Sequence, residues 1–105
     1  MTSVRLLYVT TKDTDEARKI ARELIDRRLI ACANIFPQME SIYRWKGQIE
    51  NSSEAVLILK TEERLVTKTI EAVEELHSYE VPCVLSLPVE QGSEGYLNWL
   101  TGEVN

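Results

Sequence analysis

The residues best suited to chemistry lie in one short stretch, which runs from His77 to Cys83. The stretch contains the only histidine of the 105-residue chain and one of its two cysteines, with Glu80 between them. Imidazole nitrogen and thiolate sulfur are ligands that copper and zinc prefer, and a carboxylate adds an oxygen donor. His77, Glu80 and Cys83, with Cys32 as a second thiol from elsewhere in the chain, are therefore the candidate metal ligands.

The same side chains also have simpler structural interpretations. His77 falls at the end of a predicted helix, where a charged imidazole near the last carbonyl groups gains roughly 0.3–1 kcal/mol from the helix dipole. Cys32 lies between two alanines in an apolar segment, which is typical of a small buried cysteine. The two cysteines show no Cys-x-x-Cys or zinc-type spacing. The sequence leaves both interpretations open, and any binding of copper or another divalent metal is expected to be weak.

The composition narrows the class of protein. There are 12 basic and 17 acidic residues, and the net charge of −5 disfavours nucleic acid, because phosphates need a basic surface. The chain has no Gly-x-Gly-x-x-Gly, no phosphate loop and no Gly-x-Ser-x-Gly elbow. We therefore predict no organic cofactor and no enzymatic activity, and we regard divalent cations as better suited to the acidic balance.

Two further observations concern location. The apolar runs are far shorter than the ~18 residues that indicate a membrane-spanning segment. The chain also opens without the charged and then apolar pattern of a secretory signal. We therefore expect a cytoplasmic protein that does not bind membranes, in which both cysteines stay reduced.

The candidate stretch must be positioned by the elements around it. β-Branched and apolar residues predict a first strand at residues 4–10. A first helix is predicted to begin at Asp13, which can cap the free amides, with Glu16 at the spacing of a capping box. The apolar face of this helix consists of Ala17, Ile20, Ala21, Leu24 and Ile25.

A long hairpin follows the first helix. Residues 30–45 and 48–60 read as extended segments joined by a turn at Lys46–Gly47. Pro37 interrupts the first segment, and a further break is expected at residues 51–53. About 15 extended residues span ~50 Å, whereas a domain of about 100 residues has a radius of gyration near ~13 Å. The tip should therefore leave its own core and contact another subunit through Ile42, Tyr43, Trp45 and Ile49.

A second helix is predicted after the hairpin. Thr61 is expected to cap it, and Glu62 and Glu63 occupy its first turn, where the helix dipole favours negative charge. The apolar periodicity continues to Leu76, so His77 falls at or just past the end of this helix.

The last part of the chain contains a strand and a short helix. The strand is predicted at residues 81–89, and its two prolines indicate the edge of a sheet. The short helix is predicted at residues 94–100. Tyr79, just before this strand, and Trp99, in the short helix, are candidates for lining a cleft between subunits.

The order of these elements is that of a ferredoxin-like βαββαβ fold with a short C-terminal helix. Right-handed crossovers place the first and third strands at the centre of the sheet and the second and fourth at its edges. The segments that carry prolines are then the edges. We predict a single α+β domain over residues 1–105, with Cys32 and Cys83 at opposite edges of its sheet.

Four short strings carry a resemblance to a known family. They are RLIACANI at residues 28–35, SIYRWKG at 41–47, HSYEVP at 77–82 and GYLNWL at 95–100. Together they resemble the CutA family, which is named for divalent cation tolerance, and the resemblance covers roughly residues 4–100. It implies a ferredoxin-like subunit, a homotrimer similar to the PII-type signalling trimers, and a role in tolerance of divalent metals with copper binding.

This chain also differs from some family members at possible metal-ligand positions. Some bacterial members have a cysteine near the end of the first strand and two adjacent histidines before the tyrosine. Val9 and Leu76 occupy two of those positions here, and only His77 matches. The alternative function is that of a PII-like signalling or scaffold trimer, which binds a small metabolite or a protein partner in the clefts between subunits.

Overall fold

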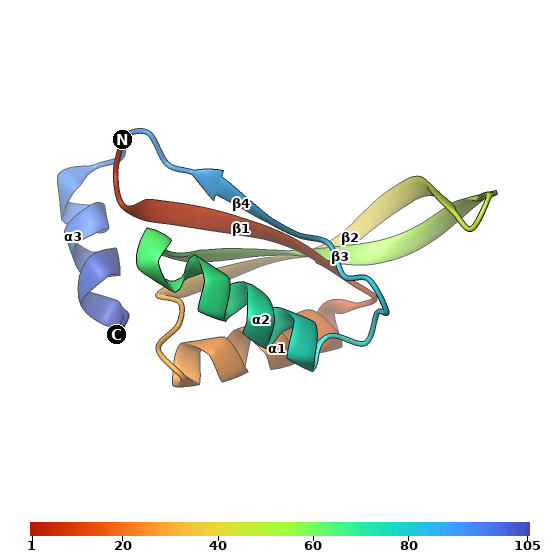
Figure 1. Ribbon diagram of the computed structural model, residues 1–105, viewed down its shortest axis with the longest axis horizontal. Coiled ribbons are helices and arrows are strands. Elements are labelled where there is room, and N and C mark those ends of the chain that lie inside the picture. The colour runs from red at the N-terminus through yellow and green to blue at the C-terminus, as the bar shows by residue number, and fades with distance from the viewer.

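One four-stranded sheet organises all 105 residues that the computed structural model describes. The elements are β1 (Val4–Thr11), α1 (Thr14–Asp26), β2 (Cys32–Trp45), β3 (Gln48–Glu62), a 3₁₀ turn (Glu63–Leu65), α2 (Val66–Leu76), β4 (Val84–Pro88) and α3 (Glu94–Glu103). The sheet is antiparallel with the order β2-β3-β1-β4. Helices α1 and α2 cover one face, and α3 lies at the end of the sheet (Figure 1). The predicted ferredoxin-like α+β fold is confirmed.

The core lies between the sheet and the two helices. Strands β1 and β3 contribute alternate residues to it, and α1 and α2 contribute their apolar faces. Its largest fully buried members are Leu7, Val9, Ile20, Leu24, Ile30, Leu57, Leu59 and Val73. Ile25, which the periodicity placed on the buried face of α1, is 43% exposed. None of the helices has both the length and the hydropathy needed to span a lipid bilayer.

The second helix begins later than predicted. Thr61 does not cap it, because its backbone pairs with Arg5 in the β1–β3 ladder and its hydroxyl donates a 2.6 Å hydrogen bond to the carbonyl of Leu29. The 3₁₀ turn then leads into α2 at Val66, and no side chain caps that helix. Thr61 and Glu62, which capping preferences assigned to the start of the helix, therefore belong to the end of β3.

The β2–β3 hairpin is the longest feature of the sheet. A bulge lies on β2 between Phe36 and Met39, which confirms the predicted interruption at Pro37. The predicted break at residues 51–53 is wrong, because these residues pair without a gap with residues 40–42. The bulge adds one extra residue, which belongs to β2, so β3 runs unbroken along the whole hairpin.

β4 is shorter than predicted. Its pairing with β1 runs from Val84 to Pro88, and residues 81–83 form a loop outside the ladder. Pro82 has no N–H group to donate to a ladder. Val84 packs on the core, so Leu85 and Leu87 point to the opposite face, where they are 58% and 48% exposed.

The end of the hairpin, residues 39–54, forms an arm that projects beyond the helices (Figure 1). The molecule accordingly measures 45 × 26 × 23 Å. The turn at the tip has positive φ at both central residues, 51° at Lys46 and 81° at Gly47. This is the type I′ geometry that matches the twist of a two-stranded hairpin. The prediction that the tip leaves its own core is confirmed.

The substitution Gly47→Ala should destabilise this turn. An added Cβ would meet no atom within 4 Å, so the loss comes from the left-handed backbone alone and should be roughly 1–2 kcal/mol. Gly95→Ala is the matched control, because Gly95 also has open space but lies in α3 without a positive φ. It should stabilise the protein by about 0.4–1 kcal/mol. Urea denaturation measures both changes, and shifts of the same sign would contradict this account.

Candidate functional site

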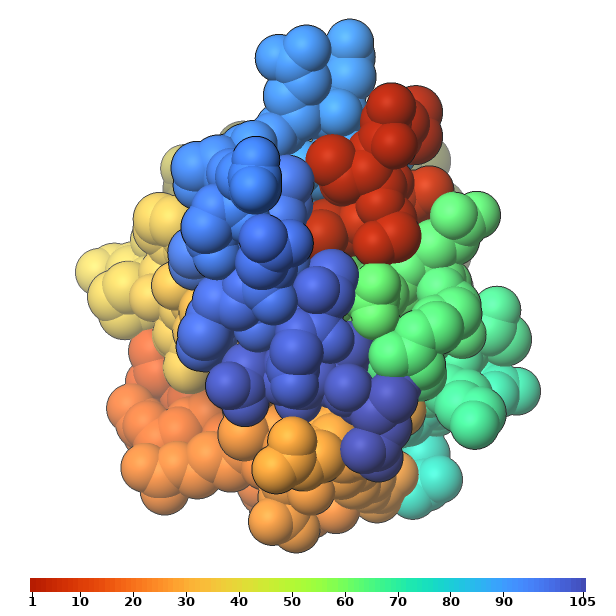
Figure 2. Space-filling model, turned by 90° about the vertical axis from the view of Figure 1, so that its left-hand side faces the viewer, coloured from red at the N-terminus to blue at the C-terminus, as the bar shows by residue number.

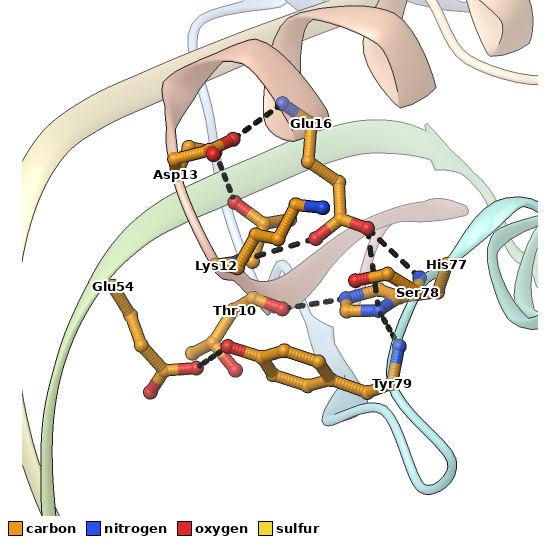
Figure 3. A network of polar contacts seen from close by, with 9 residues as sticks. Thr10, Lys12, Asp13, Glu16, Glu54, His77, Ser78 and Tyr79 are labelled. Atoms are coloured by element: carbon orange, nitrogen blue, oxygen red, sulfur yellow. Dashed lines mark hydrogen bonds and ion pairs between the residues drawn. The ribbon is translucent and has the colours of Figure 1, made fainter.

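His77 is the central residue of the site and is held by two hydrogen bonds. It follows α2 directly, and its side chain has no exposed surface. Its Nε2 lies 2.7 Å from the carbonyl oxygen of Thr10, which can only accept, so Nε2 carries the proton (Figure 3). Its Nδ1 accepts a 3.1 Å hydrogen bond from the amide of Tyr79. Both ring nitrogens are therefore used within the chain, and a metal would have to replace one of these bonds.

His77 ends α2 through its backbone and not through its imidazole. The amide of His77 donates a 2.9 Å hydrogen bond to the carbonyl of Val73, as expected for the residue that ends α2. The imidazole reaches away from the helix to the end of β1. His77 thus fastens the exit of α2 to the centre of the sheet.

Glu16 ties the same loop to the start of α1. Its Oε2 accepts a 2.8 Å hydrogen bond from the amide of Ser78, and its Oε1 accepts a 3.1 Å bond from the amide of Lys12. Asp13 caps α1 as predicted, but the Glu16 side chain reaches the Lys12 amide instead of the amide of Asp13. The sequence marked Glu16 only by its capping spacing, because its partner Ser78 lies 62 positions away.

The hydrogen bonds of Glu16 favour its charged form. Burial by itself raises the pKa of this carboxyl group, whose side chain is 8% exposed. The bonds from Ser78 and Lys12 outweigh that effect, so the pKa of Glu16 lies below its ordinary value.

Tyr79 joins the loop to the arm through a buried carboxylate. Its hydroxyl donates a 2.7 Å hydrogen bond to Oε2 of Glu54, which is 7% exposed (Figure 3). Burial raises the pKa of the Tyr79 phenol well above its usual range, and the hydrogen bond and charge of Glu54 raise it further. The Tyr79 ring also packs on His77, with 4.7 Å between centroids. Glu54 was missed because nothing in the sequence separates it from the other exposed-looking acidic residues of the hairpin.

The remaining metal-ligand candidates are dispersed within one subunit. Cys32 begins β2 and Cys83 precedes β4, so the free thiols lie at opposite edges of the sheet. Burial raises the pKa of the Cys83 thiol, and the charge of Glu54 adds to this effect. Glu80 is exposed. Nowhere in the chain do three or more histidine, cysteine or acidic side chains converge on one point.

A pocket of about 750 Å³ lies between the arm and the 79–83 segment, and we call it the arm pocket. It is lined by Tyr8, Thr10, Met39, Glu40, Ser41, Ile42, Tyr43, Trp45, Glu54, Tyr79, Glu80, Val81 and Cys83. The fold thus brings three of the four predicted contact residues of the arm, Ile42, Tyr43 and Trp45, into one lining with Tyr79, whereas Ile49 is not part of it. Trp99 is not among them, because it lies on α3, which packs at the other end of the sheet (Figure 1).

The substitution Glu16→Gln should reduce stability at pH 7 but not in acid. An amide in place of the carboxylate faces one N–H donor with another, which should cost about 1–3 kcal/mol. Because the folded-state pKa is lowered, the carboxylate stabilises fully above the ordinary value of 4.5 and loses its effect as the pH falls through the lower folded-state value. Chemical denaturation should therefore show a large difference in unfolding free energy between the unmodified protein and Glu16→Gln at pH 7. The difference should be smaller near pH 3.

Asp15→Asn is the matched control for this experiment. The Asp15 carboxylate is 90% exposed and pairs only with Arg18 on the same helix. Its replacement should change stability by no more than about 0.5 kcal/mol at either pH. An equal effect of the two substitutions would contradict the role assigned to Glu16.

Comparison with known proteins covers almost the whole chain. Residues 5–103 match the family of the CutA1 divalent ion tolerance protein. Protein CutA of Mus musculus is 46% identical over 98 residues, which are 93% of this chain and 55% of the mouse protein. The chain therefore spans about half the length of the animal relative that it matches.

Solved structures agree with the sequence match. The structure of the periplasmic divalent cation tolerance protein CutA from Archaeoglobus fulgidus has a TM-score of 0.94 at 33% identity, covering 97% of this chain and 99% of that one. The divalent cation tolerance protein from Thermus thermophilus also has a TM-score of 0.94, at 37% identity, with 97% and 99% covered. The chain belongs to the CutA1 divalent ion tolerance family.

Proposed function

We propose that the protein acts as a homotrimer in tolerance of divalent metal ions and binds copper weakly at a site shared between subunits. Membership of the CutA1 family supports the metal-related role. The observation that carries the assembly is the apolar surface that one subunit leaves uncovered on its arm and on β4. Two reduced cysteines favour a cytoplasmic location, although the relative from Archaeoglobus fulgidus is described as periplasmic.

Two different surfaces of the subunit need a partner. Ile42 and Ile49 on the arm are each 67% exposed. Leu85 and Leu87 expose apolar surface on β4, at the other edge of the sheet. Exposed apolar edges are aggregation hazards unless another chain covers them. A contact between two unlike surfaces is head-to-tail and closes into a ring when the rotation permits, and three copies are what the family resemblance implies.

Replacing Ile42 and Ile49 together by Asp should dissociate this ring. The two charges would be buried at the proposed contact without partners, which opposes association. Sedimentation equilibrium at micromolar concentration should give about three times the 12.0 kDa chain mass for the unmodified protein, and a mass shifted towards 12.0 kDa for the variant. Gln48→Glu, also exposed on the arm, is the control and should remain trimeric. A monomeric unmodified protein would overturn the assembly.

The proposed metal ligands are His77, Glu80 and Cys83, with Cys32 from a neighbouring copy. No three suitable side chains converge within one subunit. In a head-to-tail ring, the β2 edge of one copy approaches the β4 edge of the next. That arrangement would bring Cys32 of one copy towards Cys83 of another, and two soft thiolates suit Cu(I).

Copper and zinc titration of the metal-free protein tests this site. Calorimetry should detect saturable copper binding, and Cys83→Ser should weaken it at least tenfold. His77→Ala is the less specific variant, because it also removes the bonds to Thr10 and Tyr79. Glu71→Gln, on the exposed face of α2, is the control and should bind copper like the unmodified protein. No saturable binding, or binding unchanged in Cys83→Ser, would eliminate the proposed ligands.

A second candidate function is a signalling trimer that responds to a small molecule. The arm pocket favours it, because a concave site with apolar walls and a few polar groups is the usual form of a ligand site. A thermal-shift screen separates the two functions. A large shift with an organic compound and none with metals would favour the second.

A further inference from the structure

Glu54 carries a negative charge that nothing in its own chain balances. Its Oε2 accepts the hydrogen bond from Tyr79, but its other oxygen has no hydrogen-bond donor and no basic side chain within ion-pair distance. Figure 3 shows this second oxygen directed away from the Tyr79 hydroxyl. Glu54 is only 7% exposed, and a buried carboxylate is costly unless it is paired. One subunit therefore holds half of an ion pair.

The assembled trimer should bury this carboxylate further. Glu54 alternates with the core residues Ala55 and Leu57, so it lies on the sheet face opposite the helices. On the same face Tyr8 pairs with Leu85, which is exposed in one subunit and belongs to the proposed contact. Tyr8 and Glu54 both line the arm pocket, so a copy that covers Leu85 also closes the pocket. Because no lysine or arginine of the same chain lines it, we expect the balancing charge on the copy that covers it.

Arg44 is the basic side chain of the arm that lacks a partner. It is exposed, and no carboxylate of its own chain lies within ion-pair distance. The other basic residue of the arm, Lys46, lies over the ring of Trp45, with its Nζ 5.7 Å from the ring centroid. Arg44 stands directly opposite Ile49 in the hairpin, and Ile42 lies two residues before it, so the three side chains share one face. A positive charge therefore lies within the apolar surface through which the arm is proposed to contact another copy.

We propose that Arg44 of one copy enters the arm pocket of the next copy and forms an ion pair with its Glu54. The inference rests on the proposed homotrimer and specifies one of its contacts. A guanidinium group suits the pocket, because its planar fork can donate to the free carboxylate oxygen. Its faces can also stack on the aromatic walls, which include Tyr8, Tyr43 and Tyr79. The pocket is then filled by protein in the trimer and is not the small-molecule site of the second candidate function.

The proposed contact matches charge with charge and apolar surface with apolar surface. Ile42 and Ile49 lie beside Arg44 on the arm, as Leu85 lies beside the pocket that holds Glu54. Every copy offers one arginine and one carboxylate, so the same contact can repeat around a closed ring. An arm docked in another register would leave both charges buried without partners, which is costly. The pair should therefore determine how the copies join as well as how tightly.

A double-mutant cycle tests the pair in the whole protein. Arg44→Gln and Glu54→Gln should each raise the concentration at which half of the chains are trimeric by at least tenfold, because each leaves a buried charge unpaired. The double variant should dissociate no more readily than the single ones, because it removes both charges. Lys46→Gln removes a neighbouring positive charge of the arm and should stay within twofold of the unmodified protein. Sedimentation velocity over a dilution series measures all four variants, in enough urea to make the unmodified trimer dissociate within the series.

The outcomes separate this contact from the assembly itself. Losses that add in the double variant, or equal losses in Arg44→Gln and Lys46→Gln, would overturn the proposal and leave the trimer intact. Coupling of Glu54→Gln with Lys60→Gln instead of Arg44→Gln would assign the pocket to a basic residue of the uncovered sheet face and would also overturn it. If Glu54→Gln does not fold, an Arg44→Gln trimer as stable as the unmodified one would refute the pair. A monomeric unmodified protein would instead overturn the homotrimer on which the pair rests.

A monomeric background shows whether the pair lies between copies. Arg44 and Glu54 form no ion pair within one chain. In the Ile42→Asp/Ile49→Asp variant, which should be monomeric, Arg44→Gln and Glu54→Gln should therefore change the free energy of unfolding independently of each other. Urea denaturation measures these changes. Coupling that persists in the monomer would place the interaction within one chain and would contradict the proposal.

Discussion

The unequal pairing of β3 with its two neighbours is the constraint on which the rest of the structure depends. β1 pairs only with residues 55–62 of β3, whereas β2 pairs with residues 48–60. Residues 48–54 therefore have one neighbouring strand and lie beyond the core, so the arm must project. Glu54 is the first residue past the end of the β1 pairing, and the arm pocket forms where the next strand would have been. The position of the pocket thus follows from a difference in strand length.

The polar network answers a related requirement at the same end of β1. A buried carbonyl at the end of a strand needs a donor, and His77 supplies it for Thr10. Glu16 likewise receives amides from two loops that no ladder reaches. Side chains therefore fasten the 77–79 loop where backbone pairing is absent. This explains why the most reactive-looking stretch of the chain has its imidazole occupied by structural bonds.

Neither His77 nor Cys83 is free to bind a metal within one subunit. The two nitrogens of His77 are already used in hydrogen bonds, and burial holds the Cys83 thiol towards its protonated form. A metal at this junction would have to replace a hydrogen bond of the imidazole and the proton of the thiol.

The sequence by itself determined the order of the elements, the central and edge strands, the cap at Asp13, the turn at Gly47 and the protruding arm. These follow from periodicity, proline positions and turn chemistry, which act over a few residues. It also pointed to the stretch at His77, but not to Glu54 or to the bonds of Glu16. Those contacts join residues 25 and 62 positions apart, and only the packing of α1, the arm and the 77–79 loop brings them together. The start of α2 was decided in the same way, since the ladder with β1 extends β3 through Thr61 at the expense of a local cap. Local preferences determine which elements form, whereas long-range pairing decides where each element ends and which distant residues form hydrogen bonds with each other.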